Sequence, residues 1–198
     1  MSAPRIPWTR LEGSPLWHAA AAAHGVPGWR IFHDFGHPVT LYRQAAGVFQ
    51  LPYCPDLDAA ILLHDVIHDA EPQAERRSAE WARRQGCGDK VVDLILSTET
   101  HAPCDDNRLI LLDLSNLMNG MSRRAGTEAI RREYLARRGT DSGFEAGTIA
   151  YLAGLRGRIL TGIASRTGLS ACDRHGFESI LGGISEAILE LQSADPEP

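Results

Sequence analysis

Residues 55–69 read PDLDAAILLHDVIHD and combine an apolar run with two histidines and four aspartates. Leu57, Ile61 and the residues between them follow helical spacing, which predicts a buried α-helix over 55–69. His64 and Asp65 lie within this helix. An unpaired carboxylate in apolar surroundings would become neutral, whereas a bound metal cation would keep Asp65 ionised.

The rest of the chain also predicts helices and gives no stretch with the two-residue period of a strand. The expected helices lie at 16–24, 29–46, 73–85, 89–99, 108–118, 127–138, 142–164 and 177–191. Pro38 should kink or break the second of them near residues 36–38. The fold class is therefore predicted to be all-α, a single-domain helical bundle of about eight helices. An N-terminal extension at 1–13, a helical domain at 14–192 and a frayed tail at 193–198 are expected.

Composition narrows the class of protein. The 198 residues suit one domain, and the apolar fraction of 43% with a charged fraction of 23% is typical of a soluble globular protein. A net charge of −5 argues against a broad surface for a nucleic-acid duplex. No apolar run reaches the roughly 20 residues of a membrane span, and no signal peptide is recognisable. Four cysteines without a CxxC pair indicate free thiols in a reducing compartment, so a cytoplasmic location without membrane association is expected.

Two further segments share the chemistry of the His64–Asp65 pair. His33 and His37 are four residues apart, so a continuous helix would place both on one face. Asp113 lies in a leucine-rich segment and needs a partner for the same reason as Asp65. One cation bound by His37, His64, Asp65 and Asp113 would account for these positions together. Mixed imidazole and carboxylate ligands favour a divalent transition metal (Mn, Fe, Co, Ni or Zn) and leave its identity open, with Mg²⁺ favoured less by imidazole.

These segments belong to a longer ordered pattern. Its elements are Arg30, Phe32, His33 and His37, then His64 and Asp65, then Glu75, Ser78 and Ala79, then Thr98 and His101, then Asp113 to Ser115, and Arg132 to Tyr134. In this order they resemble the HD-domain superfamily of metal-dependent phosphohydrolases, and within it a bacterial branch of predicted HD phosphohydrolases. The resemblance covers residues 17–144 and implies an HD-type helical fold.

The resemblance also implies roles for individual residues. The spacing of the first two elements is similar to that of cyclic-nucleotide phosphodiesterases, which implies that His37 binds metal and that His33 is the general acid. The same likeness implies that His68 lies near bound water or a second metal ion. Mg²⁺ is compatible with this second site, and Asp65 could bridge the two ions. Arg30 would stabilise charge on the phosphoryl group together with the cation. His101 and Glu75 are candidates for supporting the ligands or a second metal, although the charged helix that carries Glu75 favours a solvated position for it.

The sequence therefore predicts a hydrolase that cleaves a small phosphate ester, a nucleotide or another phosphomonoester, by attack of metal-activated hydroxide. Two alternatives stay open: a di-iron oxygenase of the HD type and a non-catalytic metal-binding sensor. The expected partner is a small-molecule phosphate ester, and homo-oligomerisation is left open.

Overall fold

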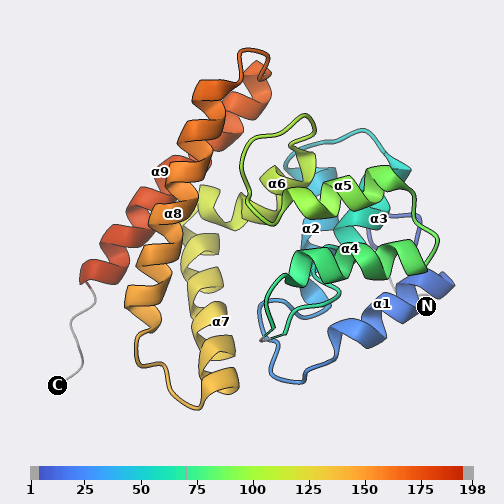
Figure 1. Ribbon diagram of the computed structural model, residues 1–198, viewed down its shortest axis with the longest axis horizontal. Helices are drawn as coiled ribbons and strands as arrows, with labels where there is room; N and C mark the ends of the chain where they lie inside the picture. The colour runs from blue at the N-terminus through green and yellow to red at the C-terminus, as the bar shows by residue number, and fades with distance from the viewer. Residues whose placement is uncertain (1–4, 70, 194–198) are drawn as a thin grey trace. The chain divides into compact units, whose positions relative to one another are not determined.

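In the residues that its structure, a computed structural model, describes, namely 5–69 and 71–193, the protein consists of helices joined by turns and loops (Figure 1). The helices are α1 (Pro15–His24), α2 (Gly36–Gly47), α3 (Pro55–Leu63), α4 (Ala74–Arg84), α5 (Asp89–Ser97), α6 (Arg108–Asp113), the 3-10 helix η1 (Leu114–Met118), α7 (Gly120–Arg138), α8 (Phe144–Ser165) and α9 (Ala171–Ser193). Because the described residues contain no strand, the predicted all-α class is confirmed.

The chain divides into two compact units, one with the described residues up to Glu99 and one with those from Thr100. The first unit contains α1 to α5, and the second contains α6, η1 and α7 to α9. The extension expected at 1–13 and the domain expected at 14–192 stay predictions. The expected tail lies outside the described residues from position 194 onward.

Helix α3 is the centre of the first unit. Its residues Leu57, Ala60, Ile61, Leu62 and Leu63 have no exposed surface. A helix that is apolar on every side must be covered on every side, and α3 packs against α1, α2, α4 and α5.

The predicted helix over residues 55–69 is wrong beyond Leu63. His64 still donates its N–H to Ala60, but the N–H of Val66 turns back to Leu63 at 3.1 Å and closes a tighter turn. Asp65 and His68 therefore lie in a turn after α3 and not on its face. The helix can end here because side chains bond the backbone groups that follow it.

Asp58, another aspartate within residues 55–69, accepts hydrogen bonds from protein groups. Asp58 is fully buried, and its carboxylate accepts hydrogen bonds from the Thr9 hydroxyl at 2.6 Å and the Arg10 N–H at 2.9 Å. The Trp8 indole also donates to the Leu51 carbonyl at 2.8 Å. The segment before α1 is thereby joined to α3, and protein groups supply hydrogen bonds to both carboxylate oxygens of Asp58.

The predicted helix over residues 29–46 is also shorter than expected. Helix α2 begins at Gly36, whose N–H donates to the side chain of Asp34 at 2.7 Å. Pro38 thus falls in the first turn, where a missing N–H costs nothing, and there is no mid-helix kink. His33 precedes the helix, so the expectation that His33 and His37 share one helical face is wrong.

The second unit is a helical bundle around the chain's most apolar segment. Leu109, Ile110 and Leu112 are fully buried, and η1 packs against α7 and α9. The single helix expected over 108–118 is replaced by α6 followed by η1. Helix α7 begins seven residues earlier than the expected position 127, because the Asn119 side chain caps it by accepting from the N–H groups of Met121 and Ser122. None of the helices in the described ranges is both long and apolar enough to cross a membrane.

Close packing of α9 on η1 makes Gly183 a test of this bundle. A Cβ atom at Gly183 would collide with the backbone carbonyl of Leu117, whereas a Cβ at the neighbouring Gly182 would meet no atom within 4 Å. We expect Gly183→Ala to lower the free energy of unfolding by about 1–3 kcal/mol. The matched change Gly182→Ala should raise it by up to about 1 kcal/mol through helix propensity. Urea denaturation measures both, and equal effects would contradict this packing.

Candidate metal centre

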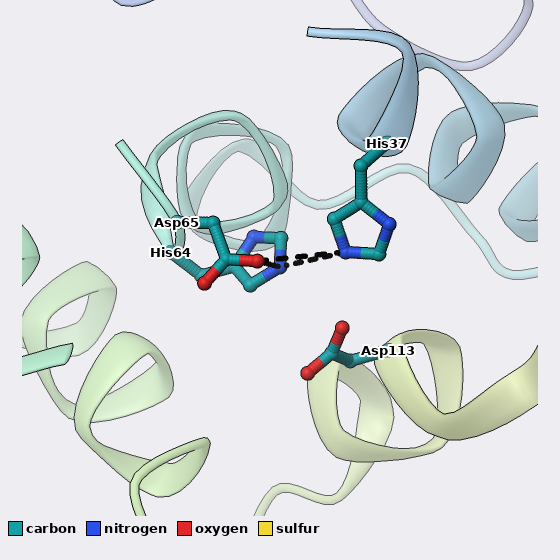
Figure 2. Close-up of side chains that lie close together, drawn as sticks. All are labelled: His37, His64, Asp65 and Asp113. Carbon is teal, nitrogen blue, oxygen red and sulfur yellow. Dashed lines mark hydrogen bonds and ion pairs between the residues drawn. The ribbon is translucent and has the colours of Figure 1, made fainter. Parts of the chain in front are cut away.

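Three side chains of the first unit converge at the end of α3. His37 lies in the first turn of α2, His64 caps the C-terminus of α3, and Asp65 follows directly. Figure 2 shows their ligand atoms turned toward one another. His37 Nε2 lies 3.2 Å from His64 Nε2, and the Asp65 Oδ2 atom lies 3.3 Å from His64 Nε2 and 3.7 Å from His37 Nε2.

The His64 ring is oriented by a backbone contact at one nitrogen. Its Nδ1 lies 3.0 Å from the Ile61 carbonyl oxygen, which can only accept a hydrogen bond. This contact assigns the proton to Nδ1 and leaves the Nε2 lone pair directed at His37 and Asp65. Metal-bound histidines commonly have such a partner on the second ring nitrogen.

The spacing of the three atoms fits a shared cation. Ligand atoms at about 2.1 Å from one ion in roughly tetrahedral or octahedral geometry lie about 3.0–3.4 Å apart. Two of the three observed separations fall in this range, and the His37–Asp65 separation is slightly longer. His64 is 1% exposed, and the side chain of Asp65 is 15% exposed. Two imidazoles and a carboxylate suit a divalent transition metal, whose identity this donor set does not select.

Asp113 belongs to the second unit, where it is the last residue of α6. Its Oδ2 lies 2.8 Å from Nε2 of His101, in the same unit. His101 has a left-handed backbone with φ of 53°, which is uncommon for a residue other than glycine. His101 is thus placed to orient the Asp113 carboxylate, and its supporting role at a metal stays a prediction. That Asp113 is the fourth metal ligand stays a prediction.

His33 and His68 come together within the first unit. Their rings are stacked with centroids 3.8 Å apart, and the centroid of His33 is 6.0 Å from that of His37. Trp29 packs edge-on against His68, with the ring centroids 6.1 Å apart. His33, for which the resemblance implies proton transfer, is therefore a neighbour of His68, for which it implies a place near bound water. Neither residue lies on a helix.

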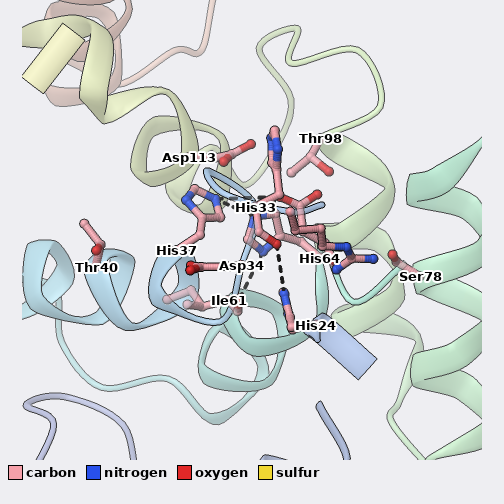
Figure 3. A network of polar contacts seen from close by, with 12 residues as sticks. His24, His33, Asp34, His37, Thr40, Ile61, His64, Ser78, Thr98 and Asp113 are labelled. Atoms are coloured by element: carbon pink, nitrogen blue, oxygen red, sulfur yellow. Dashed lines mark hydrogen bonds and ion pairs between the residues drawn. The ribbon is translucent and has the colours of Figure 1, made fainter. Parts of the chain in front are cut away.

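His24 is a buried residue near the centre that the sequence did not single out. Figure 3 shows it beside His33 and His64. Its ring nitrogens lie 3.4 Å from the carbonyl oxygen of His33 and 3.3 Å from that of Leu62. Burial lowers the pKa of His24 to about 4, so the ring is neutral near pH 7. It connects α1 to the His33 segment and to α3, and no spacing pattern signals such a contact.

The turn after α3 is bonded by side chains from two other segments. Arg30 donates to the carbonyl oxygens of Asp65 at 3.0 Å, Val66 at 3.3 Å and His68 at 2.9 Å. Ser78 on α4 contacts the intervening Ile67 through its hydroxyl. The structure thus places Arg30 on the backbone of the turn. A role for Arg30 at a substrate phosphate stays a prediction.

Two acidic residues border this turn in different ways. Asp69 accepts two hydrogen bonds from Arg77 at 2.6 and 2.7 Å, which lower the pKa of the Asp69 carboxyl to about 2. Glu75 lies in the first turn of α4. It is not among the described residues whose ligand atoms gather within metal-binding distance, so its supporting role is still a prediction.

Comparison of the chain with protein-family models gives no match, and neither the curated proteins nor the solved structures give one. The fold and the side chains therefore define the class: an all-helical protein with a His–His–Asp cluster that could hold a metal ion.

Removal of His64 tests the metal centre directly. We expect His64→Ala to lose bound divalent metal, because the variant lacks the most buried donor and leaves Asp65 without its nearest imidazole. The exposed His18→Ala is the control and should keep its metal. Elemental analysis of purified protein and the rise in unfolding temperature on adding Mn²⁺ measure both. Wild-type occupancy in His64→Ala would contradict the assignment, and Asp113→Ala in the same assay tests the predicted fourth ligand.

Proposed function

We propose that this protein is a metal-dependent phosphohydrolase that cleaves a small phosphate ester, a nucleotide or another phosphomonoester. The observation that carries the proposal is the convergence of His37, His64 and Asp65 at 3.2–3.7 Å. These are ligand positions that the HD-type resemblance implies, and they come from two separate sequence elements. The stacked His33–His68 pair beside them adds groups that can carry protons.

In the proposed reaction His37, His64 and Asp65 hold the ion, with Asp113 as the predicted fourth ligand. A bound divalent ion supplies Lewis-acid chemistry, since it polarises a phosphoryl oxygen and lowers the pKa of water. The protein's own task is to hold the ester in line with the attacking water and to move protons. His33 protonates the departing ester oxygen, and the adjacent His68 ring limits how the His33 ring can turn.

A substrate screen tests the proposed function. Purified protein loaded with Mn²⁺ is assayed for phosphate release from nucleotides and sugar phosphates, with His64→Ala and chelator-treated protein as controls. We expect release from at least one ester, lost in both controls. Substrate-dependent oxygen uptake by iron-loaded protein would instead indicate an oxygenase. Metal binding without turnover on any ester would indicate a sensor.

The His33 side chain tests the proton-transfer step. We expect His33→Ala to keep its metal but to lower turnover on an alkyl phosphate by about 10²–10⁴-fold, the usual contribution of a positioned general acid. The loss should be much smaller with nitrophenyl phosphate, because nitrophenolate departs without protonation. Turnover on the two esters is measured beside metal content. An equal loss on both esters would rule out His33 as the acid, and His68→Ala would then be measured in the same way.

A further inference from the structure

We propose that Arg30 and Ser78 are positioning residues, which fix the turn after α3 and thereby set Asp65 and His68 for metal binding. This inference rests on the proposed function. It gives Arg30 a different role from the phosphate contact that the sequence resemblance implies.

Arg30 bonds to the turn through all three of its nitrogens. Nε donates to the His68 carbonyl at 2.9 Å, Nη1 to the Asp65 carbonyl at 3.0 Å and Nη2 to the Val66 carbonyl at 3.3 Å. The residue is only 8% exposed, so little of it is left for contact with a ligand. A planar guanidinium presents its donors in a fixed fork, which the single ammonium of lysine cannot reproduce.

Ser78 bonds Ile67, the residue of the turn whose carbonyl Arg30 does not bond. Its hydroxyl oxygen accepts from the Ile67 N–H at 3.0 Å, and its hydroxyl donates to the Ile67 carbonyl at 3.2 Å. Ser78 is fully buried, and its small neighbours Ala79 and Ala82 on α4 are buried with it. A larger residue at position 78 would hold α4 away from the turn.

Together the two side chains satisfy the carbonyls of four consecutive residues, 65–68. Among the described residues no helical N–H bonds these groups, since α3 has already ended at Leu63. Hydrogen bonds to four consecutive carbonyls restrict movement of the backbone in this segment. The backbone positions from which Asp65 and His68 project are therefore held by Arg30 and Ser78.

The test measures Mn²⁺ binding to chelator-treated, full-length protein by titration calorimetry. The variants are Arg30→Lys, which keeps the charge but loses the fork, and Ser78→Ala, which removes only the hydroxyl. Their controls are Arg84→Lys on the exposed part of α4 and Ser97→Ala. Ser97 donates a hydroxyl hydrogen bond at 2.7 Å to the Leu94 carbonyl within α5, and no hydrogen bond from Ser97 to residues 65–68 is among those of the described residues.

We expect both positioning variants to bind Mn²⁺ about 10–100-fold more weakly, the usual effect of losing a group that orients a ligand. The controls should bind like the wild type. Circular dichroism and the unfolding temperature of the metal-free proteins show whether a variant is folded. If Arg30→Lys does not fold, Ser78→Ala decides the question.

The outcomes separate this inference from the proposed function. Unchanged Mn²⁺ affinity in folded variants overturns the positioning role, and a raised KM for phosphate esters at unchanged affinity would return Arg30 to the substrate. Loss of stability without loss of affinity also overturns it, because the role would then be only structural. A wild-type protein that binds no Mn²⁺ overturns both the proposed function and this inference.

Discussion

The end of α3 after Leu63 is the constraint on which the candidate metal centre depends. If the helix continued, the carbonyls of the next residues would accept from helical N–H groups, and Asp65 and His68 would project from a helix surface. Instead Arg30 and Ser78 bond those carbonyls, and the chain turns. His64 stays on the last helical turn with its Nδ1 held by Ile61. The neighbouring residues His64 and Asp65 thus bring their side chains together, one from the end of a helix and the other from a turn.

Burial in the first unit separates two kinds of aspartate. Asp58 is the more deeply buried, yet it needs no ion because Thr9 and Arg10 supply hydrogen bonds to its carboxylate. Asp65 Oδ2 instead lies 3.3 Å from His64 Nε2 and 3.7 Å from His37 Nε2. A carboxylate facing two imidazole nitrogens is stabilised by a cation or by protonation of a ring. Burial alone therefore does not select Asp65 as the candidate ligand, whereas the two imidazoles beside it do.

The proline at position 38 has a similar consequence for the other histidines. Because a proline suits the first helical turn, α2 begins at Gly36 and the chain before it is free of helical geometry. His33 therefore lies outside the helix, and its ring stacks on that of His68 with centroids 3.8 Å apart. The candidate general acid His33 and the candidate ligand His37 thus come from one short stretch, which is non-helical up to residue 35 and helical from Gly36.

The sequence by itself determined the helical class and the residue types of the site. The uninterrupted apolar run before His64 requires a central buried helix, and a histidine–aspartate pair at its end requires polar partners, whatever the rest of the chain does. Only the tertiary structure decided where that helix stops, that Arg30 contacts backbone, and that His24 and Ser78 support the site. The physical reason is that periodicity reports which face of a helix is buried. Helix ends depend on hydrogen bonds from side chains distant in sequence, here Arg30 to residues 65–68, and no local pattern encodes them.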